Sequence, residues 1–184
     1  TTINGGAISI SQNVNLGATT GALAFGGGTL RTTADITMSR ATTLNAGGGT
    51  FDVATGTTLT QNGNIDGSGG LTKSGSGTLI LGGTNTYQGG TAINAGTISI
   101  SSNANLGAAA GTLTFDGGIL QSTADVTMSR ATALNAGGGT FDVAANTTLT
   151  QNGVIGGAGG LTKSGGGMLT LGAANGYTGA TTIN

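Results

Sequence analysis

The stretch TADITMSRATTLNAGGGTFDVA, Thr33–Ala54, returns 90 residues later as TADVTMSRATALNAGGGTFDVA, Thr123–Ala144, with two changes. Outward from this stretch, Thr1–Asn94 superimposes on Thr91–Asn184 without a gap, at about two-thirds identity. A long internal repeat is typical of arrays in which each unit packs only on its neighbours. The sequence therefore predicts one continuous solenoid, with a first unit at residues 1–90, a second at 91–180 and the start of a third at 181–184.

The two ends of the sequence fall at the same point of the unit, because Thr1–Asn4 and Thr181–Asn184 both read TTIN. This coincidence predicts that the chain is a piece cut from a longer array. The sequence contains no signal-peptide pattern and no apolar run long enough to span a bilayer as a helix.

Short alternating stretches indicate β-strands throughout the unit. Ala7–Ser11, Thr50–Val53, Thr78–Leu81 and Thr97–Ser101 are rich in threonine and β-branched residues, which favour a pleated, half-buried surface. Glycine clusters such as Gly47–Gly49 separate these stretches and are typical of tight turns. The sequence therefore predicts an all-β fold.

A finer spacing inside the unit predicts the coils of a parallel β-helix, at roughly 20–22 residues per coil. Two tracks of apolar residues carry this spacing: Leu30, Phe51, Leu71 and Ile93 in one, and Met38, Leu59, Leu79 and Ile98 in the other. About four such coils fill one unit, and the extra length is expected to loop out near Asn13–Gly21 and Asn103–Gly111.

The register of the coils has two alternatives. An offset of 21 aligns Arg31, Asp52 and Lys73 as a ladder of alternating charge, whereas an offset of 20 places Phe51 on Leu71. Burial of a large apolar side chain stabilises by about 1.5–3 kcal/mol, and an exposed ion pair by about 0–1 kcal/mol. The offset of 20 is therefore expected.

Composition excludes several classes of function. The chain has 40 glycines, no proline, cysteine or histidine, and a net charge of −1 from five basic and six acidic residues. So few basic residues cannot neutralise a nucleic-acid backbone, and no nucleic-acid partner is expected. The absence of cysteine removes disulfides and thiolate metal sites.

Acid–base catalysis requires titratable groups that converge in a cleft. The acidic residues are Asp35, Asp52, Asp66, Asp116, Asp125 and Asp142. Asp52 with Arg31 and Lys73 is the best candidate cluster for a polysaccharide-acting enzyme. A solvated charge ladder or turn-capping carboxylates explain it better, because a catalytic set is expected once in an array whereas Asp52 and Lys73 recur as Asp142 and Lys163. We therefore predict that the chain is not an enzyme and has no catalytic, cofactor-binding or metal-binding residues.

The remaining motifs are weak. No nucleotide-binding glycine motif occurs, and the calcium nonapeptide repeat is absent. Tyr87 and Tyr177 offer rings for carbohydrate stacking, but single tyrosines at one repeat position are expected to pack over a turn. Threonine pairs such as Thr58 and Thr60 suggest the flat faces of ice-binding solenoids, but are not expected to recur in every coil.

Gly69–Ile100 reads GGLTKSGSGTLILGGTNTYQGGTAINAGTISI, and Gly159–Asn184 repeats most of it. This segment resembles the passenger-associated transport repeat, the autotransporter-associated β-strand repeat, whose pattern includes Gly-Leu-Thr-Lys, Asn85 and Tyr87. The second copy departs at Met168, Gly176 and Ala180. The resemblance covers about a third of each unit.

The resemblance implies a right-handed parallel β-helix in an exported bacterial protein, carried through the outer membrane by a β-barrel translocator. It implies a scaffold or adhesin segment at the cell surface or outside the cell, with host or neighbouring-cell surfaces or glycans as possible partners. A self-assembling extracellular fibre is the alternative, because strand edges at open coil ends favour pairing. A polysaccharide-acting enzyme is a distant third.

Overall fold

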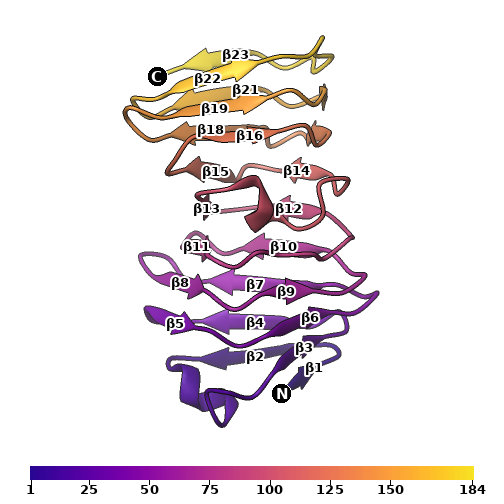
Figure 1. Ribbon diagram of the computed structural model, residues 1–184, viewed down its shortest axis with the longest axis vertical. Helices are drawn as coiled ribbons and strands as arrows, with labels where there is room; N and C mark the ends of the chain where they lie inside the picture. Colours follow the sequence, from indigo (N-terminus) through magenta and orange to yellow (C-terminus); the bar gives the residue numbers. More distant parts are fainter.

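Three sides, each built of parallel strands, wind around one apolar core in the computed structural model, which describes residues 1–184 (Figure 1). The coils stack along one axis from the N-terminus at one end to the C-terminus at the other. Two of the sides are uninterrupted sheets of eight strands, so the solenoid has about eight coils. The fold is thus the predicted all-β solenoid with parallel strands, and its right-handedness stays a prediction.

Side 1 begins with β1 (Thr2–Ile3), β3 (Leu23–Phe25), β6 (Thr42–Leu44) and β9 (Ile65–Asp66), and ends with β16 (Val126–Met128), β19 (Thr148–Gln151) and β22 (Met168–Leu171). Side 2 holds β2 (Ala7–Ile10), β4 (Thr29–Thr32), β7 (Gly49–Val53), β10 (Leu71–Ser74), β12 (Thr91–Ile93), β14 (Leu113–Phe115), β17 (Thr132–Leu134) and β20 (Ile155–Gly157). Side 3 holds β5 (Ile36–Met38), β8 (Thr58–Gln61), β11 (Thr78–Leu81), β13 (Thr97–Ile100), β15 (Ile119–Ser122), β18 (Gly139–Val143), β21 (Leu161–Ser164) and β23 (Thr181–Ile183). Two short 3-10 helices complete the elements, η1 (Asn13–Leu16) and η2 (Asn103–Leu106).

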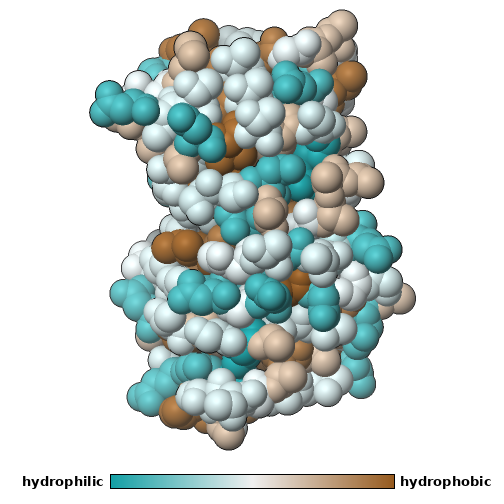
Figure 2. Space-filling view, viewed as in Figure 1, coloured by the Kyte–Doolittle hydropathy of each residue, from teal (hydrophilic) through white to brown (hydrophobic).

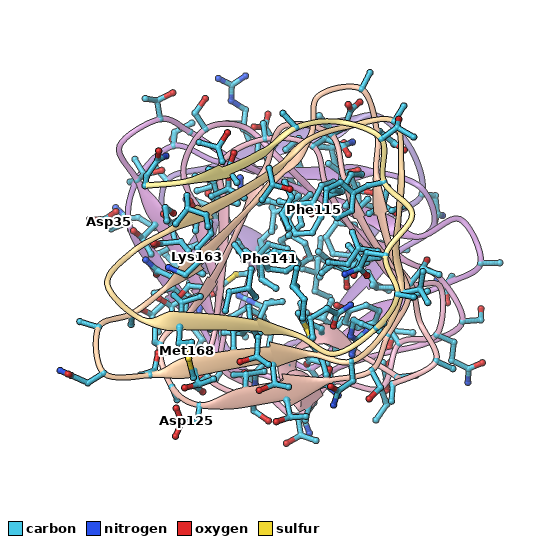
Figure 3. The ribbon with its side chains drawn as sticks, turned by 90° about the horizontal axis from the view of Figure 1, so that it is seen from above. Asp35, Phe115, Asp125, Phe141, Lys163 and Met168 are labelled. Atoms are coloured by element: carbon cyan, nitrogen blue, oxygen red, sulfur yellow. The ribbon has the colours of Figure 1, made fainter.

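Inward side chains from the three sides form one continuous core of 32 buried apolar residues. Aromatic rings of adjacent coils pack against each other at an angle: Phe25 contacts Phe51 with ring centroids 5.1 Å apart, and Phe115 contacts Phe141 edge to face at 5.3 Å. Seen along the axis, Phe115 and Phe141 lie in the middle of the coil (Figure 3). Because each coil is covered by the next, a thin core suffices for a chain with few large apolar residues.

Glycine is required where one turn passes close over another. A Cβ atom at Gly69 would lie 1.9 Å from the carbonyl oxygen of Asn45 in the coil below, so no other residue fits there. Gly56 adopts a left-handed turn conformation, with φ of 74°. In the second unit an asparagine occupies the equivalent position. There Asn146 takes the same conformation with φ of 63°, as asparagine does more readily than most residues.

The register corrects one predicted track. Phe51 pairs with Lys73 and not with Leu71, so the offset between β7 and β10 is 22 rather than 20 or 21. Leu71 pairs with Gly49, where the missing side chain leaves room for the ring of Phe25. The lysine stem takes the inward position on Phe51. The alternative charge ladder, which an offset of 21 would form, is absent as well, because only Arg31 and Asp52 are aligned.

The second track is confirmed for Leu59, Leu79 and Ile98 but is wrong for Met38, which pairs with Gln61. Successive coils differ in length, from 19 residues between Leu79 and Ile98 to 23 between Ile36 and Leu59. The extra length of each unit lies at η1 and η2 and the loops that follow them, as predicted.

Equivalent strands of the two units lie on different sides of the solenoid. β4 is on side 2, whereas its equivalent β15 is on side 3, and β5 on side 3 corresponds to β16 on side 1. One 90-residue unit therefore covers four coils and one further side, and the second unit is rotated by one side relative to the first. The equivalent residues Asp35 and Asp125 accordingly lie at different corners in the view along the axis (Figure 3).

Candidate functional site

The best predicted catalytic cluster is not brought together. Arg31 and Asp52 face outward on neighbouring strands with 3.9 Å between Arg31 Nε and Asp52 Oδ2, and the arginine side chain is 55% exposed. Lys73 points the opposite way and is fully buried. In the second unit Gln121 replaces the arginine and donates a hydrogen bond to Asp142 Oδ2 at 2.9 Å. The arrangement forms a surface contact without a cleft.

Other aspartates accept hydrogen bonds from turn backbones of the adjacent coil. The backbone N–H groups of Thr58 and Thr148 donate to Asp35 and Asp125 at 2.7 and 2.8 Å, and that of Gly137 donates to Asp116 at 2.9 Å. Asp35 and Asp125 lie on the outer rim of the coil (Figure 3). The structure holds no group of three or more side chains suited to bind a metal ion. These three carboxylates thus tie adjacent coils together.

Lys73 has a structural role at a corner of the core. Its Nζ donates to the carbonyl oxygens of Ser74, Gly75 and Ala95, at 2.6 Å for Gly75. Burial lowers the pKa of Lys73 to about 8, and the negative charge of Asp52 offsets part of this shift. Lys163 donates to the matching carbonyls of Ser164 and Gly165. The lysine of the Gly-Leu-Thr-Lys motif therefore fastens the turn that follows it.

Asn85, Tyr87 and Thr91, here called the first loop seat, hold a loop of the next coil. The Oδ1 atom of Asn85 accepts from the N–H of Ile65 in the coil below, and its Nδ2 donates to the carbonyl oxygen of Asn105 above at 2.6 Å. The Tyr87 hydroxyl is hydrogen-bonded to Thr91 Oγ1 at 2.7 Å. Burial raises the pKa of Tyr87 to about 12. The carbohydrate-stacking role considered for this ring is therefore wrong, because Tyr87 is fully buried.

The loop held by this seat is Asn103–Gly111, the second insert loop, and its equivalent Asn13–Gly21 is the first insert loop. Backbone hydrogen bonds join it to the seat, from Asn85 N–H to Ala104 O and from Ala108 N–H to Tyr87 O, both at 2.9 Å. The ring of Tyr87 lies where a Cβ atom at Gly107 would approach within 2.7 Å. Glycine at this position therefore lets the ring lie directly under the loop.

A buried arginine holds each insert loop from above. The guanidinium of Arg130 donates to Asn103 and to carbonyl oxygens including those of Leu106 and Gly111, at 3.1 and 2.9 Å. Arg40 does the same for the first insert loop and is 1% exposed. Both arginines recur in the sequence, but their role was not predicted. The available signal was an arginine at the same position of both units, Arg40 and Arg130, in a run of small residues that begins shortly after each insertion.

One outward column on side 3 consists mostly of threonines. On side 3, Thr58, Thr78, Thr97, Ile119, Thr140, Thr162 and Thr182 follow one another in register from coil to coil. The adjacent column begins with Thr60 but continues with Ile80, Ser99, Gln121 and Asp142. A single threonine column therefore recurs, while a flat face of paired threonines does not.

A shallow trough on the surface is lined by residues without reactive groups. The trough, of about 230 Å³, runs along the corner at Gly47–Gly49, Gly70 and Gly89–Gly90, and none of its lining residues is titratable. Apolar atoms on the face shown in Figure 2 are scattered in separate spots. No helix of the structure is long and apolar enough to cross a membrane.

Comparison with known proteins finds a family model that matches two parts of the chain. The model of the passenger-associated transport repeat matches residues 71–100 and 161–184. Both matched segments are similar to this repeat, and together they make up less than a third of the chain. The first runs from β10 through the first loop seat to β13, so it includes the junction at residue 90 between the two sequence units. The passenger repeat is thus the part of the solenoid that receives the insert loop of the following unit.

The chain is also 40% identical over 102 residues to a protein described as adhesin BmaC autotransporter, from Brucella suis biovar 1 (strain 1330). The aligned region covers 55% of this chain and 3% of that protein, so the chain corresponds to a very small part of its relative. No solved structure matches the chain.

Proposed function

We propose that this chain is a structural β-helical passenger segment of an autotransporter-like protein, displayed on the bacterial surface or released from it. Its role is that of a scaffold or adhesin segment, and the units 1–90 and 91–180 are its building blocks. The observation that carries this proposal is the position of the two matched segments on one core: the first lies within it, and the second continues it with Leu161 buried and with Leu169 and Tyr177 packed against it. The similarity to a protein described as an adhesin supports the same role.

The similarity to passenger repeats and to an autotransporter also suggests partners for the chain. The proposal assigns translocation to an outer-membrane β-barrel linked to the passenger, and adhesion to contacts with host cells, neighbouring cells or glycans. It assigns no enzymatic activity to these coils, and the dispersed aspartates support that assignment because each with a backbone partner caps a turn.

The test combines secretion with a search for activity. The 184-residue segment, placed between a signal sequence and a translocator barrel, should reach the cell surface in a form that resists protease. A glycan-cleavage screen of the purified chain should give no products. Cleavage by the intact chain that is lost in both Asp52→Ala and Asp142→Ala would replace the scaffold with a polysaccharide-acting enzyme.

A self-assembling extracellular fibre is the second candidate function. Its support is the parallel stacking of the coils, because the backbone groups of an outermost strand in such a stack favour pairing with a further strand. Electron microscopy of the purified chain distinguishes the two: regular filaments support the fibre, and single short rods support the scaffold.

A further inference from the structure

The turn between β18 and β19 contains an asparagine that is followed, two positions later, by a threonine: Asn146-Thr147-Thr148. Asparagines in the pattern Asn-X-Ser/Thr are acceptors for sugars in proteins that reach the cell surface. In the first unit Gly56 stands at the equivalent position, while the two threonines are the same in both units. The pattern is therefore present in the second unit and absent from the first.

Asn146 is exposed although both neighbouring coils are present. In the coil below, Asp125 Oδ1 accepts from the N–H of Thr148 at 2.8 Å, and Asp125 lies on the outer rim of the solenoid (Figure 3). In the coil above, a Cβ atom at Gly166 would lie 3.3 Å from Ala145 Cβ. The exposure of Asn146 thus comes from the turn itself, which projects from the corner between side 3 and side 1.

The side chain of Asn146 is free of contacts within the chain. Its amide makes no hydrogen bond, whereas the amide of Asn85 is held between two coils. A Cβ atom at the equivalent Gly56 meets nothing within 4 Å, so a side chain at this position extends into solvent. The Thr148 hydroxyl, which completes the pattern, makes no hydrogen bond either, because Thr148 is held only through its backbone N–H.

The backbone of this turn favours glycine. Asn146 has a φ of 63°, in the left-handed region that disfavours residues with a Cβ atom, and Gly56 has a φ of 74°. The second unit therefore carries an acceptor side chain at a position where the first unit has the residue that fits the backbone best.

We propose that Asn146 is a glycosylation site, and that its sugar donor is a sugar diphosphate carried by a nucleotide or a lipid. A glycosyltransferase of the producing cell joins Asn146 Nδ2 to the anomeric carbon of the sugar. The bond from that carbon to the diphosphate oxygen breaks, the diphosphate leaves with the bonding electrons, and Nδ2 loses one proton to a base of the enzyme. The adjacent turn of the coil above is Gly165–Gly167, so no side chain there obstructs the sugar.

Trypsin provides a matched pair of peptides from the protein recovered from the cells that produce it. After denaturation, cleavage at arginine and lysine releases Ala131–Lys163, which contains Asn146, and Ala41–Lys73, which contains Gly56. Mass spectrometry should find sugar on the first peptide and none on the second, and fragmentation should place it on Asn146. A series of added masses one sugar apart identifies a nucleotide donor, and a single larger mass identifies a preassembled glycan from a lipid carrier.

Three variants complete the test, with circular dichroism to check that each is folded. Asn146→Gly reproduces the turn of the first unit and should lose all sugar. Thr148→Val removes the hydroxyl and should lose most of it, whereas Thr148→Ser keeps the hydroxyl and should stay modified.

An unmodified Ala131–Lys163 in the unaltered protein, or sugar that persists in Asn146→Gly, would overturn the proposal. Equal sugar on both peptides would do so too, because it would place the modification on the threonine hydroxyls that the two units share. The scaffold function is tested separately by surface display, so the two failures are distinguishable.

Discussion

At the scale of single residues, the buried polar groups distinguish this solenoid from a simple stack of apolar coils. Lys73 and Arg130 each bring a positive charge inside and meet backbone carbonyl oxygens there, without a carboxylate partner. The neutral side-chain amide of Gln61 also meets a backbone carbonyl oxygen inside the core, since it donates to Arg40 O at 2.7 Å. A buried donor stabilises only where its acceptors are in place, so these residues fix particular turns and coil lengths.

The lowered pKa of Lys73 predicts a stability that depends on pH. Because its folded pKa of about 8 lies below the ordinary 10.5, the unfolded chain binds more protons between these values. The free energy of unfolding should therefore rise from pH 8 towards pH 10, by on the order of 2 kcal/mol. Above pH 10 it should fall again, because Tyr87 keeps its proton in the folded state up to about pH 12.

Urea denaturation at several pH values measures this rise. Lys73→Met keeps the length of the stem and should remove the rise between pH 8 and 10. Arg31→Gln is the control, because it removes an exposed cation. Glutamine is the residue that the second unit carries at this position, as Gln121. A rise that persists in Lys73→Met would show that another group is responsible.

At the scale of elements, the insert loop is held by two coils at once. The first loop seat supports the second insert loop from below, and Arg130 holds it from above. Ordering a loop of this length costs conformational entropy, and the hydrogen bonds to the seat and to Arg130 offset that cost. The passenger repeat and the stretch that ends in Ser-Arg, which are far apart in the unit, thus act on the same loop.

Replacement of Arg130 by alanine should release this loop. The substitution leaves several carbonyl oxygens without donors. Each one that stays buried and unsatisfied costs about 1–3 kcal/mol, so the unfolding free energy should fall by at least about 2 kcal/mol. Hydrogen exchange should then show fast exchange for Asn103–Gly111. Arg40→Ala is the matched control, because its loop lies at the end of the stack and can loosen alone, with the second loop still protected. Protection of Asn103–Gly111 in Arg130→Ala would contradict the clamp.

At the scale of the whole molecule, the rotation by one side determines what an array of these units displays. Four coils and one side per unit mean that equivalent residues return to the same side only after three units. Successive insert loops therefore point in different directions around the axis. A scaffold built this way presents the same loop on all three sides.

Distances between spin labels measure the rotation, and the absence of native cysteine makes the labels specific. Labels at Ser39→Cys and Ser129→Cys mark equivalent exposed positions of the two units. Labels at Thr58→Cys and Thr140→Cys mark one column on side 3, four coils apart. The second pair should lie about 20 Å apart, and the first clearly farther. Equal distances would exclude the rotation.

The local pattern of the sequence determined the all-β class, the coil length, the place of the insert loops and the passenger repeat. Alternation, glycine turns and a 90-residue repeat are properties of neighbouring residues, and they are readable without a partner. Leu59, Leu79 and Ile98 were aligned correctly for the same reason, since their coils contain no irregularity.

Only the tertiary structure decided the register at Phe51 and the roles of Lys73, Arg130 and Tyr87. Each depends on a contact between coils. The register depends on the space that Gly49 leaves for the ring of Phe25, Lys73 and Arg130 need backbone carbonyl oxygens as acceptors, and Tyr87 needs a glycine above its ring. The rotation of the units was also out of reach, because it is set by the sum of coil lengths that vary from 19 to 23 residues. A repeat in sequence thus specified the unit, and contacts between coils specified how units join.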